Sequence, residues 1–260
     1  MNELVGKITD RYEREARLYP VLLALFPLIV MLGLLYGPKS TVLTGVVMLA
    51  ASCGGVYLLT SVSRELGKRL ETGLYKDWGG KPSTQLLRHR DARIEAVTKQ
   101  RYHAFLSGEI NTPFPSREQE TANPQAADDI YESSVRWLLN QIRDTTKFGL
   151  LFNENIAYGF RRNALGLKPL GLASALISMA WVLLTQNEVI YSNAMPLFNV
   201  QTAVVMLPEP AIISLAVSML MIVIWLLFFT RERVRSAAFA YAEMLLRACD
   251  VLDAKHRVSS

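Results

Sequence analysis

Apolar residues are concentrated in four long blocks that polar sequence separates. No Lys, Arg, Asp or Glu occurs within residues 18–38, 40–63, 169–187 or 210–230. A helix that crosses the hydrocarbon core of a bilayer needs about 20 predominantly apolar residues, and each block is long enough. We therefore predict an all-α integral membrane protein with four transmembrane helices in two hairpins. The expected spans are residues 19–37, 41–62, 167–185 and 211–229.

The blocks divide the chain into five parts. They are a helix at 1–18, a first transmembrane hairpin at 19–62, a helical polar region at 63–166, a second hairpin at 167–229 and a C-terminal helix at 230–260. The second hairpin contains a connecting loop at 186–209. The loop is short and rather apolar, which favours a position at the membrane interface.

The polar region contains signals for where helices end. The second span is expected to continue as a helix until residues 79–82, Gly-Gly-Lys-Pro, break it. Ser83 or Thr84 is expected to cap a helix that runs to Leu106. Another helix is predicted over 128–147. Its apolar stripe consists of Tyr131, Val135, Leu138 and Ile142, and Glu132 and Arg136 have the spacing of a helical ion pair.

Charge gives the orientation of the spans. The net charge is +5, and all 28 Lys and Arg residues except Lys39 fall on one side of the predicted membrane. The positive-inside rule makes that side cytoplasmic. We expect a multi-pass protein of the bacterial inner membrane with both termini and the polar region in the cytoplasm. Cys53 and Cys249 lie too far apart in this topology to pair, so a disulfide framework is excluded.

A basic cluster follows the first hairpin, and a second one precedes the third span. The candidate contacts to anionic lipid headgroups or to a ligand are Lys81, Arg88, Arg90, Arg93, Arg161 and Arg162. An ordinary solvated helix face is an equal alternative. Nucleic acid is a disfavoured partner, because Asp91 and Glu95 interrupt the cluster and no aromatic stacking platform accompanies it.

Two patterns suggest contacts between helices. Apolar residues of the tail alternate by four and three, as in a short coiled-coil seam: Val234, Ala238, Tyr241, Leu245, Ala248 and Leu252. The seam is either an oligomerisation stem or a helix packed on the chain's own helices. Small residues four apart offer close helix contacts, either within one bundle or between copies: Ala51, Gly55, Gly171 and Ala175.

The sequence shows no catalytic or metal-binding motif. The three histidines, His89, His103 and His256, lack metal-ligand spacing, and the segment ending Gly80-Lys81 lacks the glycine pattern of a phosphate loop. We expect no enzyme activity, cofactor or metal. The four blocks carry no ionisable residue, which disfavours ion-coupled transport and leaves a passive pore possible.

Three segments carry a resemblance to known proteins: residues 78–84 (Trp-Gly-Gly-Lys-Pro-Ser-Thr), 91–93 (Asp-Ala-Arg) and 154–163, from Glu-Asn to Tyr-Gly-Phe-Arg-Arg-Asn. The chain resembles a group of uncharacterised bacterial four-span membrane proteins that are associated with anti-phage defence. The resemblance implies a membrane component and no active residues. The order of hairpin, polar segment and hairpin is also similar to bestrophin-type anion channels, in topology alone.

Three functions are compatible with these observations. The leading hypothesis is a homo-oligomeric inner-membrane protein that acts as a regulated pore or membrane-perturbing effector. The second is an anchor or sensor that recruits a cytosolic partner protein through residues 70–162. The third is a membrane enzyme that acts on lipid-linked substrates, with a candidate site at His89, Asp91, Glu95 and His103.

Overall fold

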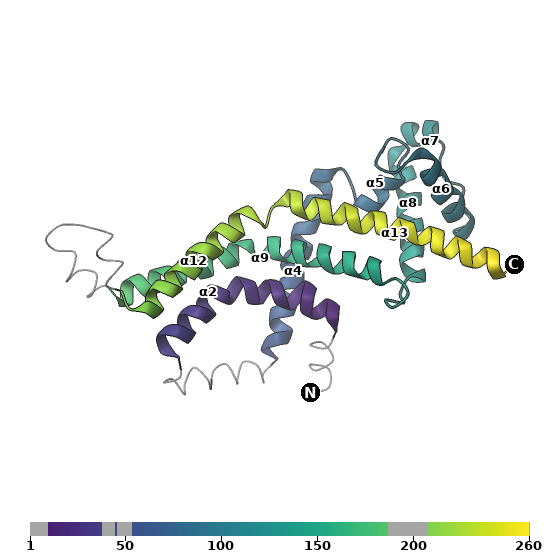
Figure 1. Ribbon diagram of the computed structural model, residues 1–260. Helices are drawn as coiled ribbons and strands as arrows, with labels where there is room; N and C mark the ends of the chain where they lie inside the picture. The colour runs from purple at the N-terminus through teal and green to yellow at the C-terminus, as the bar shows by residue number, and fades with distance from the viewer. Residues whose placement is uncertain (1–9, 38–44, 46–53, 187–206, 260) are drawn as a thin grey trace. The chain divides into compact units, whose positions relative to one another are not determined.

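A computed structural model describes residues 10–37, 45, 54–186 and 207–259 (Figure 1). Within these residues the secondary structure is helical and includes no strand, which confirms the all-α prediction. The chain divides into two compact units. We call residues 1–70 and 159–233 the apolar unit, and residues 71–158 and 234–260 the polar unit.

The apolar unit contains the helices that suit a membrane. Among the described residues, three helices are long and apolar enough to cross one. They are Glu13–Tyr36, which comprises a π-helical turn η1 (Glu13–Leu18) and α2 (Tyr19–Tyr36), then α9 (Gly149–Thr185) and α12 (Glu209–Leu227). They coincide with the first, third and fourth predicted spans. The predicted second span lies largely outside the described residues, as do Ala51 and most of the connecting loop.

The apolar unit buries hydroxyls and exposes aliphatic side chains. Ser178 and Ser218 are completely buried, whereas Leu184 and Leu227 are 69% and 64% exposed. A water-soluble bundle shows the opposite distribution. Buried serines also suit contacts between transmembrane helices, where small residues permit close approach and hydroxyls donate to backbone carbonyls. The surface of this unit therefore fits a lipid environment.

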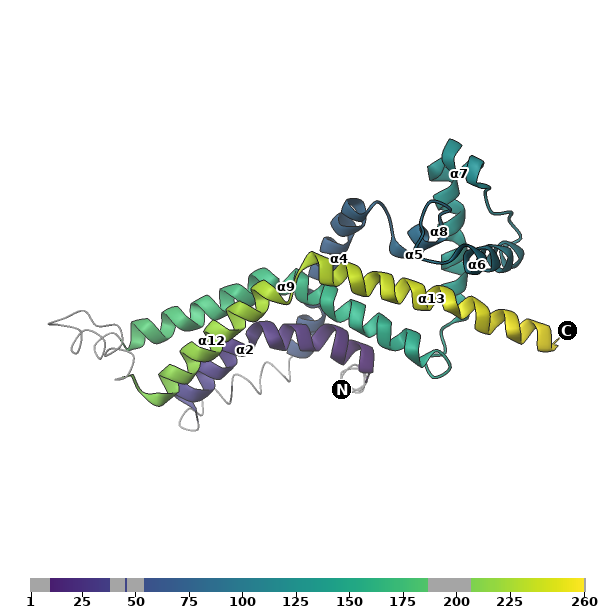
Figure 2. The same cartoon turned by 45° about the horizontal axis from the view of Figure 1, so that its top comes forward.

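Side chains of α9 donate hydrogen bonds to backbone carbonyls of η1 and α2 near the prolines Pro20 and Pro27. Pro20 has no N–H to donate to the carbonyl of Ala16 four residues earlier, and Nδ2 of Asn163 donates to that carbonyl at 2.7 Å. Ser174 donates to the carbonyl of Ala24, and Ser178 donates to that of Pro27 at 3.2 Å. Figures 1 and 2 show α2, α9 and α12 side by side in this unit.

Three glycines of α9 allow other helices to approach it closely. A Cβ at Gly159 would lie 3.0 Å from the Cβ of Ala16 in η1, and one at Gly166 would lie 2.8 Å from the backbone of Leu66 in α4 (Gly55–Trp78). A Cβ at Gly171 would overlap the indole of Trp225 in α12. Each glycine therefore permits the close approach of a different helix.

The polar unit is organised around α8 (Pro124–Gln141), which contacts α5 (Pro82–Leu87), α6 (Ala96–Glu109) and α7 (Arg117–Ala122), as Figure 2 shows. Its core includes the predicted stripe of α8, Tyr131, Val135, Leu138 and Ile142, all buried. The helix itself begins four residues earlier than predicted and ends at Gln141, so the predicted end at Lys147 is wrong.

The predicted break after Trp78 is confirmed. Gly79 adopts a φ of +82°, a conformation that glycine reaches without a Cβ penalty. Its N–H donates to the carbonyl of Lys76, and the N–H of Gly80 donates to that of Tyr75. These two bonds form a Schellman motif, which satisfies the last carbonyls of α4.

The single helix predicted from residue 83 or 84 to 106 is wrong. α5 ends at Leu87, α6 begins at Ala96, and neither Ser83 nor Thr84 is the capping residue. Side chains replace the missing helical bonds between them. Nζ of Lys99 donates to the carbonyl of Arg88 at 2.7 Å and to that of Asp91. The Asp91 carboxylate accepts from the N–H of Arg93 at 2.9 Å.

The tail forms α13 (Arg231–Ser259), and its seam is buried in the chain itself. Val234, Ala238, Leu245, Ala248 and Leu252 are at most 9% exposed. The last three belong to the core of the polar unit, with Tyr241 packed against it. The seam thus packs on the chain's own helices, and its role as an oligomerisation stem stays a prediction.

Candidate functional site

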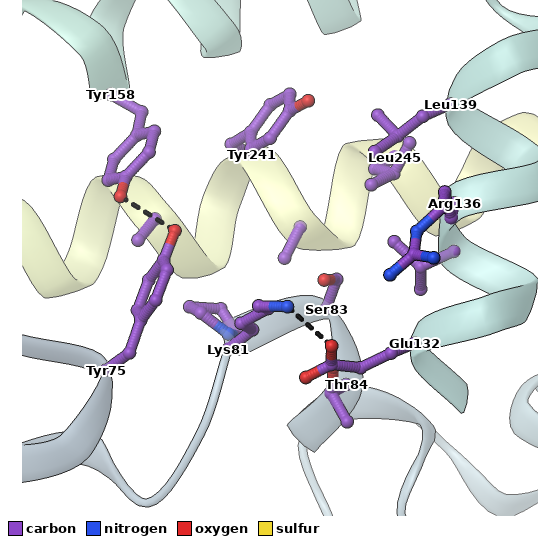
Figure 3. Close-up of a pocket in the computed structure, with 14 residues that line it drawn as sticks. Tyr75, Lys81, Ser83, Thr84, Glu132, Arg136, Leu139, Tyr158, Tyr241 and Leu245 are labelled. Carbon is purple, nitrogen blue, oxygen red and sulfur yellow. Dashed lines mark hydrogen bonds and ion pairs between the residues drawn. The ribbon is translucent and has the colours of Figure 1, made fainter. Parts of the chain in front are cut away.

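The polar unit contains a cavity of about 270 Å³ that we call the tyrosine pocket (Figure 3). Three tyrosines line it from three different helices: Tyr75 on α4, Tyr158 on α9 and Tyr241 on α13. The remaining lining residues come from α5, α8 and α13. They are Lys81, Pro82, Ser83, Thr84, Glu132, Val135, Arg136, Leu139, Ala238, Ala242 and Leu245.

The tyrosines are held by one another and by a carboxylate. The hydroxyls of Tyr75 and Tyr158 lie 3.1 Å apart. Both donate to Oε1 of Glu71, the Tyr75 bond measuring 3.1 Å. The ring of Tyr158 is parallel to that of Tyr241, with 6.1 Å between their centroids. These contacts link the three tyrosines into one aromatic wall of the pocket.

The opposite side of the tyrosine pocket carries hydrogen-bond donors. Nζ of Lys81 lies 2.5 Å from Oε2 of Glu132, so this ion pair replaces the pair predicted between Glu132 and Arg136. In Figure 3 the side chain of Arg136 extends from α8 into the same space as the hydroxyl of Ser83. Thr84 is 1% exposed, and its hydroxyl has no hydrogen-bond partner among the described residues.

These donors give the tyrosine pocket a positive balance. Lys81 and Glu132 compensate each other, which leaves the guanidinium of Arg136 as the uncompensated charge among the lining residues. An unpaired buried hydroxyl such as that of Thr84 costs about 1–3 kcal/mol.

A second cavity, of about 590 Å³, brings together residues that the sequence placed on one helix. His89, Asp91, Glu95 and His103 all line this histidine pocket. The break between α5 and α6 allows the rings of His89 and His103 to meet edge to face at 5.0 Å. Among the described residues, no group of three metal-ligating side chains is placed to hold a metal ion.

The histidines are tied to the backbone. Nε2 of His103 lies 2.7 Å from the carbonyl of Leu87, and Nε2 of His89 lies 2.9 Å from that of Pro115. Burial lowers the pKa of His103 to about 4, against the opposing hydrogen bond to Leu87. Burial also lowers the pKa of Lys99. A neutral, backbone-bonded His103 suits a packing role in this core.

The predicted basic cluster divides into residues with different tasks. Arg88 is 8% exposed. It donates hydrogen bonds to both carboxylate oxygens of Asp128, at 2.8 and 2.6 Å, and to the carbonyl of Gly79 at 2.8 Å. Arg93 pairs with Asp91 and lies over the ring of Phe239 at 4.0 Å. These two guanidinium groups are therefore occupied within the chain.

The other members of the cluster differ in exposure. Lys81 lines the tyrosine pocket, and Arg90 is exposed. In the apolar unit Arg161 is exposed, whereas Arg162 is 7% exposed and donates from Nε to Oδ1 of Asn163 at 3.2 Å. Arg161 and Arg90 are thus the members whose exposure suits contact with headgroups.

The small residues predicted as helix contacts also have defined places. Gly171 faces Trp225 of α12, and Ala175 is completely buried one turn later. Gly55 begins α4 and is half-buried. Gly171 and Ala175 are therefore used within the chain.

Sequence reasoning missed the tyrosine pocket. It treated Thr84 as a cap, Arg136 as half of a helical ion pair and Tyr241 as part of a seam. The pocket joins residues from four distant segments, and no spacing along the chain links them. The available signal was the presence of Tyr75 and Trp78 just before the break after α4, and it does not predict which distant residues they contact.

Comparisons with known proteins leave these observations to stand on their own. No protein family matches the chain, and no curated protein or solved structure proved similar to it.

Proposed function

We propose that this multi-pass membrane protein is a homo-oligomeric, regulated pore or membrane-perturbing effector of the bacterial inner membrane, acting in anti-phage defence, with its polar unit as the regulatory part. The observation that carries the proposal is the continuity of three helices. α4, α9 and α13 each contribute residues to both units, and each also supplies one tyrosine to the tyrosine pocket.

Continuous helices are suited to transmit a change at this pocket. α9 has 37 residues and is about 55 Å long at 1.5 Å per residue, which exceeds the thickness of about 30 Å of a hydrocarbon core. A ligand that favours one arrangement of the three tyrosines would bias the same helices where they belong to the apolar unit. Such coupling requires only that the ligand bind the two arrangements with different affinities.

The composition of the apolar unit favours a passive path over ion-coupled transport. The four apolar blocks, residues 18–38, 40–63, 169–187 and 210–230, hold no Lys, Arg, Asp or Glu. The polar side chains that are buried within the third and fourth blocks are hydroxyls, such as those of Ser174, Ser178, Ser214 and Ser218. Hydroxyls and apolar constrictions can line a gated pore. Oligomerisation would supply the further helices that a conducting path needs.

The test is reconstitution of the purified full-length protein in liposomes of bacterial lipids, together with its mass in detergent micelles. An oligomer with release of ions or of a small dye would support the proposal. A monomer that inserts and releases neither would overturn it. A stoichiometric soluble partner in a pull-down, with no flux, would favour the anchor hypothesis instead.

The histidine pocket supports a second candidate, an enzyme that acts on lipid-linked substrates, because the four predicted residues, His89, Asp91, Glu95 and His103, line one cavity. Conservative variants test it without emptying the core: Asp91→Asn and Glu95→Gln. Full biological effect in both variants would remove this candidate, and loss in both with normal folding would favour it.

A further inference from the structure

We propose that the tyrosine pocket binds a small organic anion, in which a phosphate or carboxylate group is attached to a compact aromatic or apolar body. The inference names the ligand class of the site that the proposed function treats as regulatory, and in that respect it rests on the proposed function. The binding itself can be measured without any flux.

Donor chemistry at one end of the pocket specifies the anion. Ser83 and Arg136 line this end of the cavity, where the hydroxyl of the one and the guanidinium of the other occupy the same space (Figure 3). Each of these groups can donate, and the guanidinium is always charged. A guanidinium fork matches the two oxygens of a carboxylate or phosphate. The uncompensated positive charge therefore calls for an oxyanion.

The remaining walls specify the body of the ligand. Pro82, Val135, Leu139, Ala238, Ala242 and Leu245 provide aliphatic surface, and the three tyrosines provide aromatic surface. Ligand pockets typically measure about 300–1,000 Å³. At about 270 Å³ the cavity is too small for a dinucleotide or a folded peptide, and it suits a compound with one ring.

The arrangement differs from a phosphate loop. The donors are side chains from α5 and α8, whereas a phosphate loop presents a run of backbone N–H groups between a strand and a helix. The pair of Lys81 and Glu132, 2.5 Å apart, stands at the same end of the cavity. The two charges of this pair compensate each other, so Arg136 supplies the net positive charge among the lining residues.

The test measures binding of phenyl phosphate to the full-length protein in detergent micelles by calorimetry. Phenol, which keeps the ring, and inorganic phosphate, which keeps the anion, serve as comparison probes. We expect phenyl phosphate to bind more tightly than either. We expect Arg136→Gln to weaken it about tenfold, because one charge-assisted contact is lost, and Ser83→Ala to weaken it less.

The matched control is Arg247→Gln, which removes another exposed arginine of the polar unit that does not line the pocket. It should bind as the unaltered protein does. Equal affinity of Arg136→Gln and the unaltered protein, or no binding of phenyl phosphate, would overturn the inference. Competition by short-chain phosphatidic acid would identify the natural anion as a lipid headgroup, and lack of competition would identify it as a soluble compound.

The two proposals fail separately. Binding of phenyl phosphate that depends on Arg136, in a protein that releases nothing from liposomes, would keep the ligand site and overturn the pore. Flux from liposomes by a protein that binds no small anion would keep the pore and overturn the ligand site.

Discussion

Arg88 holds three segments of the polar unit together. Its side chain joins the end of α5 to Asp128 on α8 and to the Gly79 carbonyl at the turn after α4. A Cβ at Gly80 would lie 2.7 Å from Nη2 of the same guanidinium. The paired glycines therefore serve both the turn and the space that Arg88 occupies.

Replacing Arg88 should destabilise the polar unit strongly. Arg88→Gln leaves the Asp128 carboxylate without its bidentate partner, and breaking such a buried pair costs about 3 kcal/mol or more. Thermal unfolding followed by circular dichroism in micelles measures the change. Arg247→Gln removes a solvent-exposed pair with Glu243 and should cost less than about 1 kcal/mol. Equal losses in the two variants would contradict the role given to Arg88.

Acidification should weaken the polar unit through His103. The pKa of this imidazole is about 4 in the folded chain, against 6.5 for the free group. The unfolded chain therefore binds an extra proton between these values, and stability falls as the pH drops from about 6.5 towards 4, by about 2 kcal/mol. Glu120, Lys99 and His89 also face His103.

A variant separates His103 from its titrating neighbours. His103→Gln keeps a donor for the Leu87 carbonyl and cannot take up a proton. Its melting temperature should depend less on pH between 6.5 and 4 than that of the unaltered protein. The same slope in both proteins would show that other groups cause the loss of stability.

At the scale of elements, α9 is the helix to which the apolar unit is fitted. Gly159, Gly166 and Gly171 admit η1, α4 and α12 in turn, and Asn163 donates to η1 between them. Lys168 on the same helix donates to the carbonyl of Phe229 at 3.1 Å, beyond the last turn of α12. A positive group there suits the negative end of the α12 dipole.

The contact of Gly166 with the backbone of α4 predicts a large effect of a single methyl group. Gly166→Ala would place its Cβ 2.8 Å from the backbone of Leu66, which cannot move aside as a flexible side chain could. We expect a lower melting temperature in micelles and separation of α4 from α9. Gly73→Ala on α4 meets nothing within 4 Å and should stabilise its helix by up to about 1 kcal/mol. A neutral Gly166→Ala would contradict the close crossing.

Hydrophobic pattern predicted the elements well where one helix face or one apolar block decides the structure. The three described spans and the stripe of α8 are examples. It failed where a side chain more than one helical turn away replaces backbone hydrogen bonds. At the break between α5 and α6, Lys99 donates to the carbonyls of Arg88 and Asp91, and the pattern of apolar residues does not predict this contact.

At the scale of the whole molecule, the chain combines a unit that exposes aliphatic side chains, as a lipid environment permits, with a unit that buries its apolar side chains in a core. Both units share α4, α9 and α13. The tyrosine pocket is lined by all three, so the proposed ligand would contact each of these three helices. The sequence predicted the spans and the polar helices, but the shared pocket depends on the folded arrangement.

Membrane embedding predicts resistance to extraction. The protein should stay in the membrane fraction after washing with alkaline carbonate and leave it only with detergent, because three helices present aliphatic surface. A protein held only by its basic residues would be released by high salt. Release by carbonate would contradict the assignment of the spans.

The most direct test of the central claim is ion flux from liposomes that contain the full-length protein, measured with and without phenyl phosphate. We predict flux above that of empty liposomes, altered by phenyl phosphate in the unaltered protein and in Arg247→Gln, and unaffected by it in Arg136→Gln. Correctly inserted protein that gives no flux above empty liposomes, with or without the anion, would contradict the account.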